Sequence, residues 1–266
     1  MRKITANKGN RDEASKFYRQ SIELLQQKRL PFLIGGAFAL ARHTGIARDT
    51  KDFDLFVRAA DVDRVLEIFR QSGLPTEKTH AHWLAKVFCG AHVIDIIYRG
   101  GNGLCEVDDS WFARARKAKV LGLSVRVCAP EESIWMKAYI MERERYDGAD
   151  VAHLLLHCSE KIDWRHLLER FGPDWRVLLS HLMLFGFIYP SERQRVPPSV
   201  IEALIEKLRK ERMATVTERV CFGTLLSRAQ YLHDVREEGF RDARLDERCR
   251  MTMAELEAWT AKRPRS

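Results

Sequence analysis

The sequence contains no long, uninterrupted hydrophobic run. Its longest apolar stretches, such as residues 177–189, include polar side chains and are too short to cross a bilayer as a helix, which takes about 20 apolar residues. The N-terminal segment MRKITANKGNRDEASKFY is charged and lacks the apolar core of a secretory signal peptide. We therefore expect a soluble protein of the cytoplasm.

The cysteine patterns of disulfide frameworks and zinc sites are also missing. No two of the six cysteines have CxxC spacing, and the nine histidines form no zinc-ligand pattern with them. A chain of 266 residues can bury a sizeable core without disulfides. We therefore expect reduced thiols, most of them buried.

Internal repeats and low-complexity segments are absent, and the charge is unbalanced toward the basic side. The 45 lysines and arginines exceed the 37 aspartates and glutamates, which gives a formal net charge of +8. Such a charge attracts phosphate-rich partners, but it does not distinguish a nucleotide from RNA or DNA. Motifs have to make that distinction.

The stretch IGGAFALARHTGIARDTKDFDLFV, residues 34–57, combines two features that are informative together. A Gly-Gly pair ends one apolar run, and Asp52 and Asp54 lie one residue apart inside the next. Side chains alternate between the faces of a strand, so these two carboxylates point the same way. Their repulsion is costly unless a cation or a proton relieves it, and such oxygen ligands suit Mg²⁺. The pattern indicates a metal site.

A third acid lies in a predicted β-hairpin. Residues 84–88 and 93–98 are short apolar runs around a glycine-containing turn, and Asp95 lies in the second run among valine and isoleucine. An acidic side chain in such a run is costly unless it is paired or bound to a metal. Asp95 is therefore a candidate third ligand.

The order of predicted elements indicates an α+β fold with a mixed sheet. Helices and strands alternate along the first part of the chain, and from residue 163 onward the pattern is almost entirely helical. We therefore expect one domain at residues 1–157 and an all-helical one at residues 158–266. The helices are expected at residues 12–28, 37–43, 61–72 and 130–146, and the strands at residues 31–34, 52–57, 84–88, 93–98 and 123–128.

This arrangement resembles the nucleotidyltransferase superfamily with a polymerase β-type palm. In that family a GG or GS turn precedes a DxD strand, and a third Asp follows on a neighbouring strand. The resemblance covers residues 32–156. The stretches RDTKDFDLFV and PEESIWMKAYIMERERYDGADVAHLL are most similar to the bacterial branch related to abortive-infection and type IV toxin nucleotidyltransferases.

The resemblance implies a palm domain flanked by helices, with a two-metal site that binds an NTP. Gly35 and Gly36 would let the backbone approach the triphosphate, next to the N-terminus of a short helix. Asp52 and Asp54 would hold Mg²⁺ or Mn²⁺ on the phosphates. Asp95 would hold a second ion and help to activate the attacking hydroxyl.

Further residues correspond to the accessory positions of that family. Lys137 corresponds to a helical lysine that contacts phosphate, and Asp147 and Asp150 correspond to later acidic positions, with Arg143 or Arg145 as supporting charges. Tyr146 departs from the pattern, because many relatives have arginine there. Arg48, Thr50 and Lys51 are candidate nucleotide contacts in the loop before the acidic strand.

Several of these residues also have purely structural explanations. The glycines can form a plain turn, and Lys51 and Lys137 can be solvated. Asp147 and Asp150 can stabilise the start of a helix in YDGADV. In the C-terminal half, Ser227, Arg228, Tyr231 and Asp234 are candidates to select an acceptor, on composition alone.

We therefore predict a metal-dependent nucleotidyltransferase that moves a nucleoside monophosphate from an NTP to a hydroxyl acceptor. The acceptor can be a small molecule, a tRNA end or a protein side chain, and the resemblance allows an antitoxin-like protein partner. The alternative is a regulatory protein on the same fold that binds nucleotide or RNA with little or no catalysis. The presence of all three carboxylates favours the enzyme.

Overall fold

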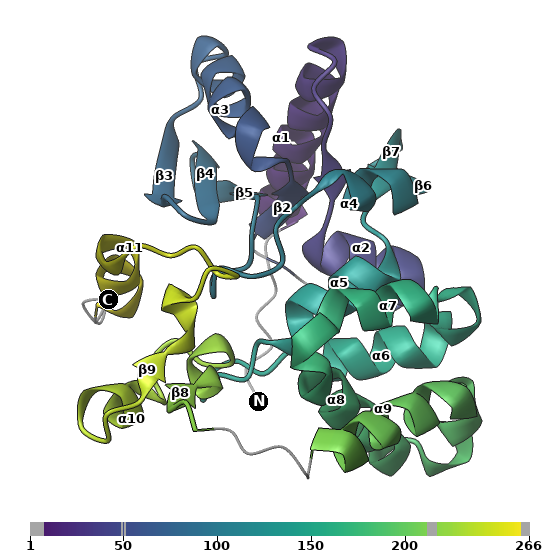
Figure 1. Cartoon of the computed structure of the whole chain (residues 1–266). Coiled ribbons are helices and arrows are strands. Elements are labelled where there is room, and N and C mark those ends of the chain that lie inside the picture. The colour runs from purple at the N-terminus through teal and green to yellow at the C-terminus, as the bar shows by residue number, and fades with distance from the viewer. Residues whose placement is uncertain (1–7, 49, 51, 212–216, 262–266) are drawn as a thin grey trace. The chain divides into compact units, whose positions relative to one another are not determined.

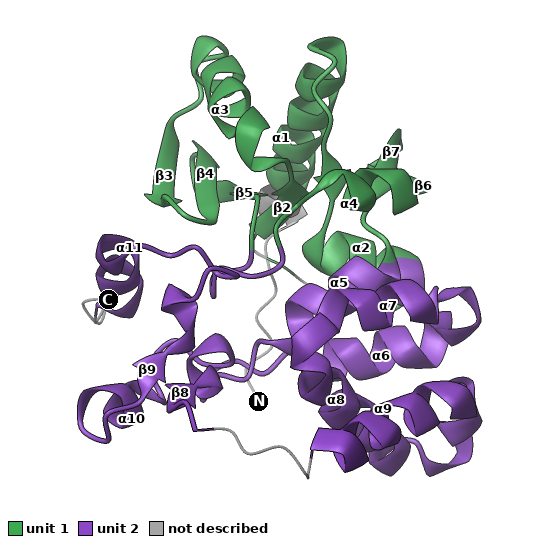
Figure 2. Cartoon of the chain, viewed as in Figure 1, with its two compact units in different colours: residues 1–42, 46–99, 106–129 green, residues 43–45, 100–105, 130–266 purple. Residues whose placement is uncertain are grey.

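The structure is a computed structural model that describes residues 8–48, 50, 52–211 and 217–261 (Figure 1). Its chain forms two compact units (Figure 2). The first unit comprises residues 1–42, 46–99 and 106–129, and the second comprises residues 43–45, 100–105 and 130–266. The chain therefore passes between the units repeatedly. The domain division predicted after residue 157 is a different division and stays a prediction.

The first unit is built on a mixed seven-stranded sheet with the order β3-β4-β5-β2-β1-β7-β6. The pairs β2–β5 and β1–β7 are parallel, and the other neighbours are antiparallel. The fold class predicted from the sequence is confirmed. The strands are β1 (Leu33–Ile34), β2 (Asp52–Phe56), β3 (Thr76–His80), β4 (Leu84–Cys89), β5 (His92–Ile97), β6 (Arg116–Val120) and β7 (Leu123–Val127).

The helices of this unit place an apolar layer against the sheet. Tyr18 of α1 stacks on Phe53 of β2 with ring centroids 4.7 Å apart, and Phe38 of α2 packs edge-on against the same ring. Val65 and Phe69 on one face of α3 are fully buried. The helices are α1 (Lys8–Gln27), α2 (Gly36–Thr44), α3 (Val62–Gln71) and α4 (Asp109–Arg114).

Two strands and one helix of this unit were not predicted. Strands β3 and β6 form the two edges of the sheet, and most of their residues are polar and partly or fully exposed. They lack the apolar alternation that predicts a half-buried strand. Helix α4 is only six residues long and begins where the Asp108 carboxylate accepts hydrogen bonds from the N–H groups of Ser110 and Trp111.

The second unit is largely helical, as predicted. Its two-residue strands β8 (Val220–Cys221) and β9 (Arg241–Asp242) pair in parallel. Four of the six cysteines are buried in the two units, and no helix within the described ranges combines the length and apolar character of a membrane span. The α-helices are α5 (Pro130–Ala138), α6 (Gly148–Cys158), α7 (Trp164–Phe171), α8 (Trp175–Ile188), α9 (Pro198–Glu211), α10 (Leu232–Arg236) and α11 (Met253–Thr260).

The helix predicted for residues 130–146 is wrong in its second half. Helix α5 ends at Ala138, and the chain then turns back on itself through a bridge between Met141 and Tyr146. Contacts with the C-terminal segment hold this turn: the Glu142 carboxylate accepts hydrogen bonds from the Ser227 hydroxyl and the Arg228 N–H, both at 2.8 Å. Tertiary contacts therefore override the helix propensity of these residues.

Candidate active site

Three predicted acids lie on one face of the sheet in the first unit. In the parallel pairing of β2 with β5, Asp54 lies directly opposite Asp95, and Asp52 lies opposite Val93. Adjacent strands are about 4.8 Å apart, so the Asp54 and Asp95 backbones are immediate neighbours. Asp52 lies two residues before Asp54 and therefore faces the same way.

The opposite face of the same strands fixes this register. Phe53 and Leu55 of β2 and Ile94 and Ile96 of β5 are completely buried. A slip of one residue would expose this apolar set and bury the carboxylates. The positions of the acids are therefore determined by the packing of their apolar neighbours.

The Gly-Gly pair is required where α2 begins against β2. A Cβ atom on Gly36 would overlap Oδ2 of Asp54, and one on Gly35 would overlap the ring of Phe56. Gly36 also has a φ of 51°, in the left-handed region that favours glycine. The pair is therefore more than a plain turn, because it allows a helix to start in contact with a site carboxylate.

The start of α2 brings positive electrostatic potential to Asp54. The N–H groups in the first turn of an α-helix have no partner within the helix, and they favour anions. The Gly35 N–H does not contribute, because it donates to the Asp54 carbonyl at 2.9 Å within the sheet. The phosphate contact predicted for Gly35 cannot use this N–H and stays a prediction, as does that of Gly36.

A lysine that the sequence reasoning missed is paired with the third acid. Lys86 of β4 lies opposite Asp95 of β5, and its Nζ is 2.6 Å from Oδ1 of that carboxylate. The side chains are 23% and 14% exposed, so water screens the pair only partly. The hairpin contained a usable signal: counting outward from the pair Cys89 and His92 at the turn brings Lys86 opposite Asp95.

The negative charge of this site affects the pKa of the nearby Tyr18 hydroxyl. Burial and the charges of Asp52, Asp54 and Asp95 together raise its pKa. In the loop before β2, the Thr50 hydroxyl donates to the Asp52 carbonyl at 3.0 Å and accepts from the Asp52 N–H at 3.3 Å. Thr50 thus fixes the start of the acidic strand.

The remaining loop candidates are less defined. The side chain of Arg48 is exposed in the same loop. Lys51 lies outside the described residues. The roles of both in nucleotide binding stay predictions.

The accessory residues form an ion-pair cluster in the second unit. Nζ of Lys137 is 2.8 Å from Oδ2 of Asp147 and 2.7 Å from Oδ2 of Asp150. Of the two candidate arginines, Arg145 makes two hydrogen bonds to Asp147, both at 3.0 Å. The structure thus brings Lys137, Asp147 and Asp150 together, and Lys137 is not a solvated helix edge.

The environment of Asp147 favours its ionised form. Burial opposes ionisation, but the hydrogen bonds from Arg145 and the charge of Lys137 outweigh it and lower the pKa of Asp147. Its carboxylate caps no N–H of α6 among the described residues. Its side chain therefore serves the ion pairs rather than the helix start.

The described acids do not form a complete set of metal ligands by themselves. Among the described residues, no group of three or more His, Cys, Asp or Glu side chains is arranged to hold a metal ion. The donor chemistry still fits a hard divalent cation, because Asp54 and Asp95 are adjacent carboxylates on one face of the sheet and a cation between them would relieve their repulsion.

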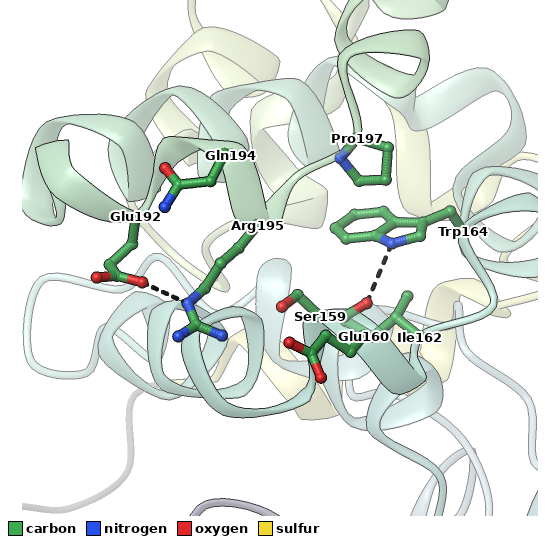
Figure 3. A pocket seen from close by; sticks show the side chains of 8 residues that line it. All are labelled: Ser159, Glu160, Ile162, Trp164, Glu192, Gln194, Arg195 and Pro197. Atoms are coloured by element: carbon green, nitrogen blue, oxygen red, sulfur yellow. Dashed lines mark hydrogen bonds and ion pairs between the residues drawn. The ribbon is translucent and has the colours of Figure 1, made fainter.

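A separate cavity of about 500 Å³ lies in the second unit (Figure 3). The Trp164 indole forms one wall and donates from Nε1 to the Ser159 carbonyl at 3.3 Å. The ion pair of Arg195 with Glu192 lies on the other side. None of the site residues predicted above is among the described residues that line it, which are Ser159, Glu160, Ile162, Trp164, Glu192, Gln194, Arg195 and Pro197.

A mixed sheet with a Gly-Gly turn against an acidic strand, and a third acid on the neighbouring strand, is typical of nucleotidyltransferases. Residues 14–171 match the model of a family described as nucleotidyl transferases of unknown function (DUF2204). The chain belongs to this family and is a transferase enzyme. The predicted superfamily is confirmed.

Solved structures with a similar arrangement share little sequence with the chain. The antibiotic-resistance factor ANT(2'')-Ia is 16% identical, and the match covers 63% of this chain and 95% of that one with a TM-score of 0.44. An antigenic nucleotidyltransferase-like protein from Paracoccidioides brasiliensis is 15% identical, with coverages of 69% and 92% and a TM-score of 0.44. The lincosamide antibiotic adenylyltransferase LnuA is 13% identical, with coverages of 53% and 94% and a TM-score of 0.39. None of the curated proteins matches the chain in sequence.

Proposed function

We propose that this enzyme transfers a nucleoside monophosphate from an NTP to a hydroxyl group of an acceptor. The observation that carries the proposal is the register that sets Asp54 against Asp95, with α2 starting in contact with Asp54. In the reaction the acceptor oxygen bonds to the α-phosphorus, the bond to the β-phosphate oxygen breaks, and pyrophosphate leaves.

The carboxylates would bind the metal ions, and the first turn of α2 would bind the phosphates. Asp52, Asp54 and Asp95 would hold Mg²⁺ or Mn²⁺, which when bound offsets the charge of the phosphates. The N–H groups in the first turn of α2 would bind phosphate oxygens, because they are unpaired within the helix and carry positive partial charge. A carboxylate oxygen of Asp95 would accept the proton from the attacking hydroxyl.

The accessory residues would act on the phosphates as well. Lys137 would contact a phosphate oxygen, and Asp147 and Asp150 would hold its ammonium group in place between turnovers. Arg48 and Thr50 would contribute from the loop before β2. The short ion-pair distances around Lys137 support a fixed rather than a freely moving lysine.

We further propose that the helical region, residues 158–266, binds the acceptor. Its cavity of about 500 Å³ is within the range of about 300–1,000 Å³ usual for small-molecule sites, which favours a small-molecule acceptor. A tRNA or protein acceptor is the other outcome of an acceptor assay. A tRNA acceptor would agree with the toxin-like resemblance and with an antitoxin-like partner in the cytoplasm.

Substitution of the acids tests the catalytic site. We expect Asp52→Ala and Asp95→Ala to abolish pyrophosphate release from every NTP while the far-UV circular dichroism spectrum stays unchanged, because both side chains face away from the apolar core. Asp63→Ala is the matched control, since Asp63 is an exposed aspartate that also pairs with a lysine. Wild-type turnover in either site variant would refute the mechanism.

Titration calorimetry with Mg²⁺ and each NTP tests the alternative function. The enzyme is expected to bind at least one NTP and to release pyrophosphate when the acceptor is present. A regulatory protein on the same fold would bind the nucleotide and release none.

A further inference from the structure

The Lys86 ammonium pairs with Asp95, the carboxylate that a metal cofactor would also bind. It projects from β4 onto Asp95 of β5, on the face of the sheet that also carries Asp52 and Asp54. The contact of 2.6 Å between Nζ and Oδ1 is an ion pair, and both side chains are largely shielded from water. The lysine is therefore part of the acidic site rather than of the surface.

The two carboxylates on this face favour a nearby cation even when the protein holds neither metal nor nucleotide. Asp54 and Asp95 lie directly opposite each other, and their like charges repel. The Lys86 ammonium offsets that repulsion at Asp95. A divalent cation on the same carboxylate would do so more strongly, and its charge would in turn repel the ammonium.

The chemistry of lysine suits a group that changes partners. Its ammonium is a compact charge with three donors on a flexible four-carbon stem. When a cation takes over Asp95, the ammonium can swing to another anion without any backbone change. The phosphates of a nucleotide bound on this face would be the nearest anions for the Lys86 ammonium.

We propose that Lys86 is an internal counter-cation of Asp95 that is exchanged for the divalent cation and then binds a phosphate oxygen of the donor nucleotide. The proposal rests on the proposed function, because it takes the acids to be the metal ligands. It adds a residue that couples metal binding to nucleotide binding.

Mn²⁺ affinity without nucleotide tests the first half of the exchange, by electron paramagnetic resonance. We expect Lys86→Met to bind Mn²⁺ about tenfold more tightly than the wild type, the scale of one partly shielded charge interaction. Lys86→Arg should stay close to the wild type because it keeps the charge. Lys86→Gln is a second neutral variant should the methionine variant fold poorly.

Nucleotide affinity in saturating Mg²⁺ tests the second half, by calorimetry. Here we expect Lys86→Met to bind the NTP about tenfold more weakly, because one phosphate contact is lost. Tighter metal binding together with weaker nucleotide binding is the signature of exchange. A lysine with a merely structural role would weaken both or neither.

Lys78→Met is the matched control for charge. Lys78 lies on the neighbouring strand β3 and also pairs with an aspartate at 2.6 Å, but that aspartate, Asp63, is exposed. Both affinities should stay at the wild-type values in this variant. An equal effect of Lys78→Met and Lys86→Met would overturn the proposal, since the effect would then be one of net charge.

Asp95→Asn separates this proposal from the proposed function. If Asp95→Asn lowers Mn²⁺ affinity but Lys86→Met leaves it unchanged or weaker, the counter-cation proposal fails and the metal site stands. If the wild type and Asp95→Asn bind Mn²⁺ equally, the metal site itself fails, and the exchange fails with it.

Discussion

At the scale of single residues, the site depends on a side chain that is missing. Gly36 leaves open the space that the Asp54 carboxylate fills, and its φ of 51° suits a residue without Cβ. Any larger residue has to move either the start of α2 or the carboxylate. The glycine is thus as much a part of the site as the acid beside it.

Gly36→Ala is expected to lower both stability and activity. The variant combines left-handed backbone strain, about 1–2 kcal/mol, with a collision against Oδ2 of Asp54. Gly73→Ala is the control, because Gly73 has a φ of 79° but no described atom lies within 4 Å of its Cβ position. Chemical denaturation should show a larger loss for Gly36→Ala than for Gly73→Ala, and only Gly36→Ala should lose turnover. Equal losses would mean that the collision relaxes freely.

The sequence predicted the placement of those residues whose position follows from local pattern. The alternation in DFDLF put Asp52 and Asp54 on one face, and the apolar context singled out Asp95. Lys86 was missed because its significance depends on its partner across the hairpin, which is found only by counting residues outward from the turn. A residue's partner is the part of the site that sequence patterns convey least.

At the scale of elements, a side chain of α8 forms a hydrogen bond with the C-terminal end of α5. His181 of α8 is buried, and its Nε2 lies 2.9 Å from the carbonyl oxygen of Ala138, the last residue of α5. The last carbonyls of a helix have no partner within it. The imidazole supplies that partner and ties α8 to the end of α5.

This contact makes stability depend on pH. Burial lowers the pKa of His181, while the hydrogen bond to Ala138 acts in the opposite direction more weakly. The unfolded chain, with an ordinary histidine pKa of about 6.5, then binds more protons than the folded one as the pH falls. We expect the free energy of unfolding to fall below about pH 6.5 by up to about 1.4 kcal/mol per pH unit from this group.

Urea denaturation between pH 8 and pH 5 measures this dependence. His181→Gln should remove part of the slope, whereas the exposed His157 provides the control variant His157→Gln. If both substitutions leave the wild-type slope, another group is responsible.

Elements were predicted well wherever periodicity was strong. The buried strands β2 and β5 and the helix α3 lie within a few residues of their expected ranges. The polar edge strands β3 and β6 were missed, and α5 was extended too far because ERERY favours helix locally. Hydrogen bonds to Glu142 from residues about 85 positions away ended that helix, and such contacts are invisible to local periodicity.

At the scale of the whole molecule, each of the two compact units is built from several separate stretches of the chain. Residues 100–105 pack within the second unit although the chain on both sides belongs to the first. The Asn102 amide donates to the Leu225 carbonyl at 2.9 Å, and a Cβ on Gly103 would press against Cys249. A piece of chain that ends at residue 129 lacks these partners.

Residues 1–129 produced alone are therefore expected to be less stable than the full chain. Buried groups such as Leu104 and Cys105 become exposed when the second unit is missing. Thermal unfolding should begin at a lower temperature, and amides in residues 100–105 should exchange faster with deuterium. Asn102→Ala in the full chain serves as the control, because it removes one contact and keeps the rest. An unchanged melting temperature in the shortened chain would contradict the interleaved arrangement.

The register of β2 and β5 affects how easily activity can be lost during evolution of the family. The side chains that hold the sheet together and those proposed to do chemistry are different residues on opposite faces of the same strands. A single change of an aspartate can therefore remove the chemistry and leave the architecture intact, and relief of like-charge repulsion can even favour it. Inactive descendants should arise easily in such a family. The fold of a relative is thus a weaker guide to its activity than the side chains proposed to do the chemistry.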